Sequence, residues 1–504
     1  MAVCLLACLL AAGCGPPTGV LQAPDRPNVI LILTDDLDAR LLDEHLADYP
    51  NIRKLASEGT TFSNAFVTDP LCCPSRATIL RGQYAHNHRI VGNWWPRGGS
   101  RKFRVLGLGR STLATWLQDE SYRTVLIGKY MNDYFGTRVP VGWDDWYAIA
   151  GNFRSTDLNE NGRIVSYEPK RHHLDDVLAQ KAVGYVRDTS ADEQPFFMWL
   201  GTKAPHAPAI PAPRHKNTFL DARLARPPSF NEHDVSDKPE WIRDNPPLKP
   251  KRIAAMNSLY RDRLRSMLAV DDMIGRLVEA LTESGELDNT YIFFTSDNGW
   301  HAGEHRLTPG KWTAYEEDIR VPLIVRGPGV AEGRTLSHLV LNNDLAPTFA
   351  DLAGVGVPSF VDGRSLKPLL SAEPTPEEEW RRAFLVEAAA ERRSPPSHLA
   401  DEGSIQPLLT GDPLPEGWRQ AARAGVWSQE DWGRPGLKAV RTEQYLYVEY
   451  GTGERELYDL RKDPDQLDNR YGTAGPELLQ RLGGRLEVLQ GCSEVDCRAA
   501  EDGF

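Results

Sequence analysis

Four short apolar runs in the sequence predict strands that are buried on both faces. Each run is rich in β-branched or aromatic residues and lacks the polar alternation of a half-exposed strand, which is typical of a parallel sheet covered by helices. A regular apolar stripe over residues 252–285 predicts one long helix that contributes to this cover. The pattern therefore predicts an α/β fold. The four runs are VILIL at 29–33, RTVLIG at 123–128, PFFMWLG at 195–201 and YIFFTS at 291–296.

The C-terminal part of the chain has a different pattern. Residues 437–450 and 454–460 are typical of antiparallel strands, and residues 476–490 predict a last helix. The charged stretch EPTPEEEW at 373–380 indicates a linker. We therefore expect a large domain over residues 26–375 and a smaller antiparallel α+β domain over residues 376–504.

Two segments lack lasting periodicity and predict insertions. Residues 215–250 are rich in Pro, Arg, Asp and Trp, and residues 390–435 hold several Pro, Gly and Trp. Because long loops in compact domains are often functional, we expect residues 215–250 to form an ordered insertion that lies over the functional site of the large domain. The second is expected to form an irregular insertion in the smaller domain.

Residues 1–25 predict a leader for export. The segment MAVCLLACLLAAGCG is too short to cross a bilayer and has the apolar centre of a signal peptide. Residues 10–14 resemble a bacterial lipobox, in which Cys14 would carry a lipid; ordinary signal cleavage is the alternative. Either reading predicts a secreted, periplasmic or cell-envelope protein, attached to a membrane only through Cys14. In an oxidising compartment, Cys492 and Cys497 are close enough in sequence to form a small disulfide loop.

Composition narrows the choice of partners. The chain has 504 residues, 25% of them charged, and a formal net charge of −12. This charge argues against general adhesion to polyanions, and the sequence holds no nucleic-acid-binding motif. An anionic substrate must therefore be attracted by a local cluster of cations.

The stretch PLCCPSRATILRG at residues 70–82 places a cysteine at the start of a helix. Pro74 is the residue type favoured at the first helical position, so Cys72 lies where free backbone N–H groups and the helix dipole attract anions. Arg76 adds a positive charge. The structural alternative is a buried cysteine pair, with Cys73 and Ile79 in the core.

Polar residues follow the predicted strands at their carboxyl ends, which share one edge of a parallel sheet. Asp35 and Asp36 follow the first run, and Asp297 and Asn298 follow the last. Their hard oxygen atoms suit Ca²⁺ or Mg²⁺ and not zinc. For Asp35 and Asp36, the alternative is that an aspartate caps the helix that follows.

Two further residues have the same setting. Lys129 ends the run at 123–128, and His206 follows the run at 195–201 within the proline-flanked sequence KAPHAP. Flanking prolines hold a side chain rigidly, as a positioned acid requires. The alternatives are a solvated strand end and a surface-loop histidine.

The motif Cys-x-Pro-Ser-Arg at 72–76 resembles the signature of the type I sulfatases, which have an alkaline-phosphatase-like fold with a mixed, mostly parallel sheet between helices. The resemblance implies that a maturation enzyme oxidises Cys72 to formylglycine. One hydroxyl of its hydrate would attack sulfur and expel the alcohol, and the other would then release sulfate.

The resemblance also implies the role of each site residue. Arg76 stabilises the hydrate, Lys129 and Lys311 contact the sulfate, and His206 binds sulfate or assists the leaving alcohol. The ion is Ca²⁺, with Mg²⁺ as an alternative. Its implied ligands are Asp35, Asp36, Asp297, Asn298 and the hydrate at Cys72.

Two stretches indicate the substrate. Lys129-Tyr130 is followed by Met131 and Asn132 where many sulfatases carry a histidine, and FNEHDVSDKPEWI at 230–242 follows later. Both are similar to the N-acetylglucosamine-6-sulfatase branch, which implies hydrolysis of a 6-sulfate in a glycosaminoglycan or related glycan. With such a substrate, His301 and His305 in NGWHAGEH are expected to reach the sugar. The alternatives are an arylsulfatase, a phosphate or phosphonate monoester hydrolase, and an exported glycan-binding protein without activity.

Overall fold

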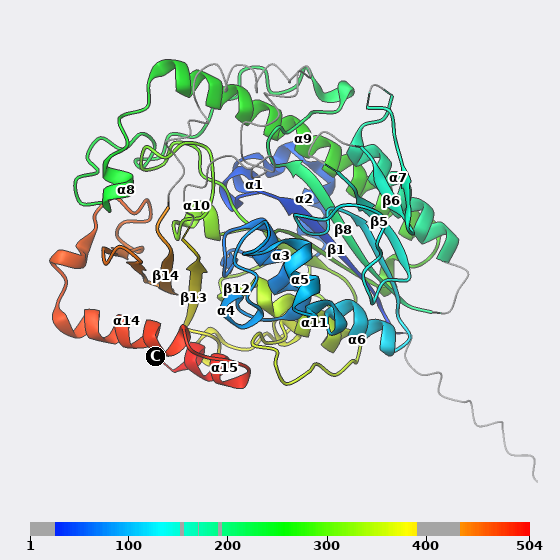
Figure 1. The fold of residues 1–504 in the computed structure, drawn as a ribbon. Coiled ribbons are helices and arrows are strands. Elements are labelled where there is room, and N and C mark those ends of the chain that lie inside the picture. Colours follow the sequence, from blue (N-terminus) through cyan, green and yellow to red (C-terminus); the bar gives the residue numbers. More distant parts are fainter. Residues whose placement is uncertain (1–25, 152–155, 170, 190–193, 391–433, 504) are drawn as a thin grey trace, which may run out of the picture.

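A ten-stranded mixed sheet forms the centre of the protein (Figure 1). The structure is a computed structural model that describes residues 26–151, 156–169, 171–189, 194–390 and 434–503. The five central strands are parallel, and antiparallel pairs lie on both sides of them. In order across the sheet, the strands are β11 (Arg334–Leu336), β2 (Thr60–Phe62), β10 (Leu323–Arg326), β9 (Thr290–Ser296), β1 (Asn28–Asp35), β8 (Phe196–Pro205), β4 (Arg123–Gly128), β5 (Asp145–Ile149), β6 (Leu158–Glu160) and β7 (Arg163–Val165).

Helices cover both faces of this sheet. Alternate residues of each buried strand point to opposite sides, so both faces are apolar and both need cover. In β1, Ile30 and Ile32 pack against α2 (Pro50–Ser57), α7 (Leu174–Thr189) and α9 (Pro250–Glu283). On the other face, Val29 and Leu31 pack with α3 (Cys72–Arg81), α6 (Leu113–Asp119) and α11 (Leu345–Leu352). The predicted α/β sandwich is confirmed.

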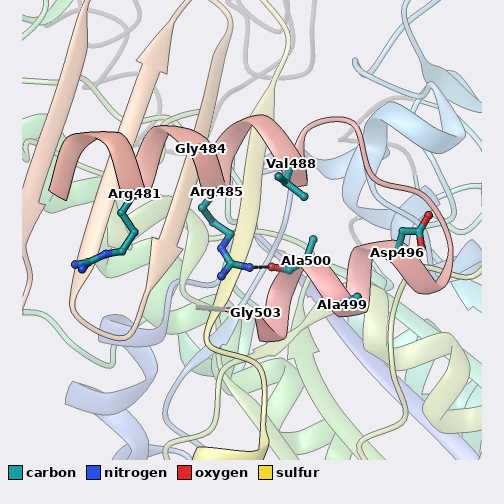
Figure 2. A pocket seen from close by; sticks show the side chains of 8 residues that line it. All are labelled: Arg481, Gly484, Arg485, Val488, Asp496, Ala499, Ala500 and Gly503. Atoms are coloured by element: carbon teal, nitrogen blue, oxygen red, sulfur yellow. Dashed lines mark hydrogen bonds between the residues drawn. The ribbon is translucent and has the colours of Figure 1, made fainter. Parts of the chain in front are cut away.

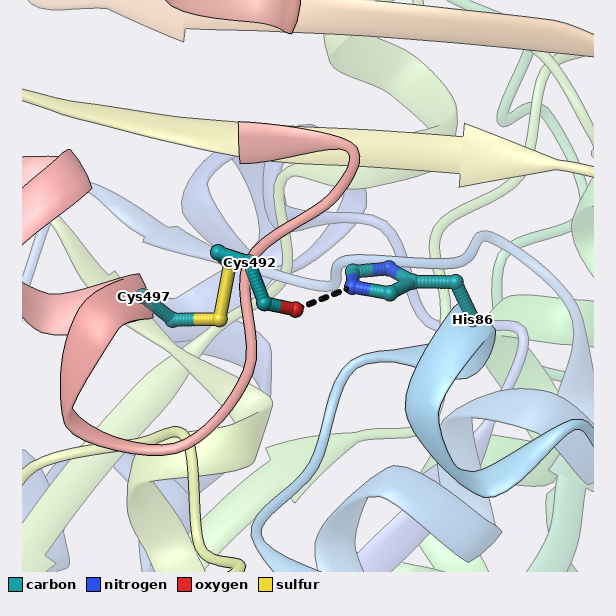
Figure 3. Close-up of side chains that lie close together, drawn as sticks. All are labelled: His86, Cys492 and Cys497. Carbon is teal, nitrogen blue, oxygen red and sulfur yellow. Dashed lines mark hydrogen bonds between the residues drawn. A yellow bond between two sulfur atoms is a disulfide. The ribbon is translucent and has the colours of Figure 1, made fainter. Parts of the chain in front are cut away.

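A four-stranded antiparallel sheet follows in the C-terminal part, and it includes the antiparallel strands that were predicted over residues 437–450 and 454–460. The disulfide Cys492–Cys497 closes a loop between the two helices that follow this sheet, with 4.9 Å between the two Cα atoms. Figure 3 shows this loop beside His86. The elements are β13 (Ala383–Ala388), β14 (Leu437–Thr442), β15 (Tyr445–Tyr450), β16 (Arg455–Asp459), α14 (Pro476–Leu489) and α15 (Val495–Asp502).

Short elements connect these layers. Among the described residues, no helix has the length and apolarity needed to cross a bilayer. The predicted leader over residues 1–25, and most of the predicted insertion at 390–435, lie outside the described residues. The short elements are α1 (Ala39–His45), β3 (Ala65–Phe66), α4 (Ala85–His88), α5 (Gly99–Val105), α8 (Glu240–Arg243), α10 (Glu316–Ile319), β12 (Val340–Leu341) and α12 (Lys367–Leu370).

Candidate active site

The carboxyl ends of β1 and β9 lie side by side and bring three carboxylates together. Thr34 pairs with Ser296, so the next residues of both strands leave the sheet at the same edge. Asp36, in the left-handed conformation with φ of 64°, directs its backbone N–H to Asp297 Oδ1 at 3.2 Å. The Asn298 side-chain amide donates to Asp36 Oδ1 at 2.7 Å. This edge therefore carries closely packed oxygen atoms.

Helix α3 begins at Cys72 and directs it toward the same edge. The Cys72 Sγ lies 3.6 Å from Asp35 Oδ1, and its side chain is fully buried. One turn later, Arg76 Nε donates to Asp297 Oδ2 at 2.7 Å, and Arg76 Nη1 donates to the Lys129 carbonyl at 2.8 Å. Arg76 thus fixes the helix to two strand ends.

Two lysines and a histidine complete the cluster. Lys129 Nζ donates to Asp35 Oδ2 at 2.6 Å. Lys311 Nζ lies 2.7 Å from Cys72 Sγ and also donates to Asp36 Oδ1. His206 Nε2 lies 3.6 Å from Asp36 Oδ2. Two ammonium groups and an imidazole therefore lie beside the cysteine and the two aspartates.

Burial and charge set the protonation of this cluster. Burial alone would raise the pKa of Asp35 and of Asp36, but the ammonium groups of Lys129 and Lys311 outweigh it and hold both pKa values below their ordinary range. Burial also raises the pKa of the Cys72 thiol well above its usual value, despite the two lysines. An unmodified Cys72 is therefore protonated at neutral pH and a poor nucleophile.

The donor set fits a hard divalent cation. Ligand atoms of Asp35, Asp36, Cys72 and His206 all lie within 4.8 Å of one another. The Asn298 Oδ1 atom is buried and has no hydrogen-bond partner among the described residues. An amide oxygen without a partner beside ionised carboxylates is the type of ligand that Ca²⁺ and Mg²⁺ take.

All nine residues expected at the site lie in this one cluster. They come from segments that span residues 35 to 311, and each is buried or nearly so. The residues are Asp35, Asp36, Cys72, Arg76, Lys129, His206, Asp297, Asn298 and Lys311.

The two histidines expected to reach a sugar are buried beside carboxylates. The Nδ1 atom of His301 lies 2.8 Å from Asp318, and that of His305 lies 2.7 Å from Glu232. Their exposed fractions are 1% and 0%. Neither lies on an open surface of the described residues.

One positioning residue was missed by sequence analysis. Arg263 lies on α9, within the stripe predicted as core, and donates from Nη2 to the Asp36 carbonyl at 2.7 Å. Its guanidinium also stacks 3.8 Å from the centre of the Trp300 ring. The signal was a charged residue inside an apolar stripe, since such a residue is buried only when it has partners.

A second concave surface lies elsewhere. Figure 2 shows a pocket between α14 and α15, lined in part by Arg481, Arg485 and Asp496. It contains none of the nine predicted site residues, and Asp496 is its single carboxylate. The strand-end cluster is therefore the candidate active site.

The fold and this cluster define an alkaline-phosphatase-like α/β hydrolase. A family model described as Sulfatase matches residues 27–355, and the chain belongs to the sulfatase family. It is a sulfuric ester hydrolase. The chain is 36% identical to an N-acetylglucosamine-6-sulfatase of Capra hircus, over 96% of this chain and 87% of that protein.

Other relatives share the same core. An arylsulfatase of Volvox carteri is 34% identical, over 99% of this chain and 78% of that protein. A solved structure of a protein in complex with its substrate D-glucosamine-2-N,6-O-disulfate superposes with a TM-score of 0.72 at 27% identity, covering 92% of this chain and 97% of the other. The predicted family resemblance is confirmed.

Proposed function

We propose that this sulfatase hydrolyses the 6-O-sulfate ester of N-acetylglucosamine in a glycosaminoglycan or related glycan. The likeness to an N-acetylglucosamine-6-sulfatase over 96% of the chain supports this substrate. The related structure in complex with D-glucosamine-2-N,6-O-disulfate supports the 6-O position of the ester. The observation that carries the chemistry is the position of Cys72 Sγ, which lies between Lys311 and Asp35 at the strand edge.

The proposed nucleophile is formylglycine, formed when a maturation enzyme oxidises Cys72. The raised pKa of the buried thiol supports this proposal, because a protonated thiol could not attack sulfur. A hydrated aldehyde offers two hydroxyl groups. One hydroxyl loses its proton and its oxygen forms a bond to sulfur, while the bond from sulfur to the sugar oxygen breaks and that oxygen takes up a proton. Loss of the second hydroxyl proton then re-forms the aldehyde, as the bond from its carbon to the sulfate oxygen breaks and sulfate leaves.

The surrounding side chains hold the reacting groups. The ammonium groups of Lys129 and Lys311 lie near the nucleophile and would bind sulfate oxygens. Burial lowers the pKa of His206, against the opposing effect of Asp36 and Asp35. We assign to His206 either a contact with the sulfate or assistance to the departing sugar oxygen. The buried ion pair between Arg76 and Asp297 holds the first turns of α3 against the end of β9.

We assign a divalent cation, Ca²⁺ or alternatively Mg²⁺, to the oxygen cluster. Asp35, Asp36, Asp297 and Asn298 would hold it, together with the hydrate at position 72. When bound, the ion would supply positive charge that stabilises the ionised hydrate and offsets the charge of the sulfate.

We also propose that the protein is exported. The disulfide Cys492–Cys497 supports this proposal, because such bonds persist in oxidising compartments. The N-terminal sequence supports it as well, with a lipid on Cys14 as one form of attachment.

Two measurements test the proposed function. Mass spectrometry of the Cys72 peptide from natively produced protein should show the aldehyde, and the same protein should release sulfate from 6-O-sulfated N-acetylglucosamine. An unmodified thiol in active protein would refute the formylglycine mechanism. Because of the Volvox relative, an aryl sulfate and an aryl phosphate are measured in parallel. Faster turnover of the aryl sulfate than of the sugar sulfate would favour an arylsulfatase instead.

A further inference from the structure

One long stretch of the chain has no acidic residue. Residues 70–118 contain eight Arg and Lys residues and no Asp or Glu, although the whole chain has 70 Asp and Glu among 504 residues. The stretch begins just before Cys72, and only its first part forms the active site. Its remaining cations therefore need a separate explanation.

Four of these remaining cations are exposed to solvent. Arg89, Arg101, Arg104 and Arg110 are exposed, as is Arg138 from the segment after β4. Among the described residues, no carboxylate lies within ion-pair distance of any of these five arginines. Asp133 is the nearby acid that interacts with Arg101 and Arg104, and it is half-buried. The surface therefore has an excess of positive charge on a protein whose net charge is −12.

Aromatic rings lie among these arginines. Trp95 is 44% exposed and Phe135 is 53% exposed. The rings of Trp94 and Phe135 stack with their centres 6.2 Å apart and an interplanar angle of 18°. The guanidinium of Arg101 lies 4.8 Å from the centre of the Trp95 ring. Large exposed rings cost free energy in water unless a ligand covers them.

Backbone and side-chain contacts join this surface to the active site. Asn93 Oδ1 accepts a hydrogen bond of 2.9 Å from the backbone N–H of Cys73, and Asn93 directly precedes Trp94. The backbone N–H of Ser100 donates to the Asn132 carbonyl at 2.8 Å, three residues after Lys129. The segments that carry the exposed arginines and rings are thus linked to the segments that carry Cys72 and Lys129.

We propose that this basic aromatic surface, formed by Arg89, Trp95, Arg101, Arg104, Phe135 and Arg138, binds the saccharide units next to the one that is desulfated. The proposal rests on the proposed function, because it assumes a sulfated saccharide in the site. Guanidinium groups form paired hydrogen bonds with planar or tetrahedral anions, so they suit sulfate and carboxylate groups. The exposed rings suit the apolar faces of sugar rings. The ligand is therefore a sulfated oligosaccharide or polysaccharide.

A charge-reversal experiment tests this surface. Arg101→Glu/Arg104→Glu is compared with Arg53→Glu/Lys54→Glu, which makes the same change of charge on exposed residues of α2, on the opposite face of the sheet. Binding of a heparin hexasaccharide is measured by calorimetry on a Cys72→Ala background, so that no turnover occurs. We expect at least a tenfold loss of affinity for the first pair and less than a twofold change for the second. Trp95→Ala/Phe135→Ala should weaken binding at high salt, where charge is screened.

The same variants with Cys72 intact give an independent readout. The ratio of kcat/KM for a 6-O-sulfated hexasaccharide to that for the 6-O-sulfated monosaccharide should fall at least fivefold in Arg101→Glu/Arg104→Glu. Equal hexasaccharide binding by wild type and this variant would overturn the proposal. Hexasaccharide binding that depends on Arg101 and Arg104 in a protein that cleaves no sulfate ester would instead refute the proposed function and leave the surface in place.

Discussion

Each charged side chain of the active site depends on a neighbour of opposite charge. Lys311 contacts both Cys72 and Asp36. Its removal takes away a cation beside the proposed nucleophile at position 72 and leaves the buried Asp36 carboxylate less well paired. We predict that Lys311→Ala lowers kcat by about 10²-fold to 10³-fold, as expected for loss of one preorganised charge. Initial rates on 6-O-sulfated N-acetylglucosamine measure this effect.

The matched control for this change is Lys367→Ala. Lys367 pairs with Asp351 on the surface, where an ion pair contributes little to stability or activity. We expect its kcat to stay within twofold of wild type. A Lys311→Ala protein that retains more than a third of the wild-type kcat would contradict the assigned role.

A second prediction concerns His86, which lies outside the catalytic cluster. Its burial lowers the pKa, but hydrogen bonding and attraction to Glu387 outweigh this effect and raise the pKa above the ordinary value of 6.5. Its charged form is therefore favoured in the folded state, so its contribution to stability is complete below pH 6.5 and is lost as the pH rises through the raised pKa. The thermal unfolding temperatures of wild type and His86→Gln should differ most at pH 6 and become more alike toward pH 8. A constant difference would contradict this prediction.

At the scale of elements, the disulfide loop holds α4 in place. The Cys492 carbonyl accepts hydrogen bonds from His86 Nε2 at 2.9 Å, visible in Figure 3, and from Asn87 Nδ2 at 3.1 Å. Cross-linking restricts the unfolded chain, and a loop this short contributes about 2 kcal/mol. We predict that Cys492→Ala/Cys497→Ala lowers the free energy of unfolding by about this amount, measured in urea. Reduction of the wild type should give the same loss; no change with either treatment would contradict the prediction.

Strand and helix positions were predicted best where one signal dominates. The run at 123–128 became β4 with the predicted bounds, since an apolar run of that length fits only a buried strand. The strand β10, which the four apolar runs did not include, begins at Leu323 shortly after α10 (Glu316–Ile319) ends. The strand β13 (Ala383–Ala388) was not predicted, since it lies between a charged stretch and a predicted insertion and pairs with the distant β14.

Six of the nine residues of the candidate active site were predictable because they lie at the carboxyl ends of strands that meet at one edge, whereas Cys72, Arg76 and Lys311 were recognised from the family motif. Asp35 and Asp297 are 262 positions apart in the chain, yet their strands pair in register. The surroundings of His301 were not predictable in the same way. Its partner Asp318 precedes β10 rather than following a strand, and no local pattern indicates that the two side chains meet.

At the scale of the whole molecule, a bound cation would connect elements that are far apart in the sequence. Its proposed ligands Asp36 and Asn298 follow β1 and β9, and α3 is tied to the same edge through Arg76. A ligand that binds only the folded state stabilises it, by about 2.7 kcal/mol at a free concentration 100 times its Kd. We therefore predict that EDTA lowers the thermal unfolding temperature and that Ca²⁺ restores it.

Variants separate this site from unspecific ion effects. Asn298→Ala removes the amide oxygen that has no hydrogen-bond partner among the described residues. In this variant, the unfolding temperatures in EDTA and in Ca²⁺ should therefore differ less than in wild type. Asp288→Asn removes a carboxylate that is 98% exposed, so the difference should remain. Recovery with Mg²⁺ at the same concentration would indicate the smaller ion. If unfolding occurs at the same temperature in EDTA, Ca²⁺ and Mg²⁺, these oxygen atoms do not form a cation site, and the lysines alone must offset the charge of the bound sulfate.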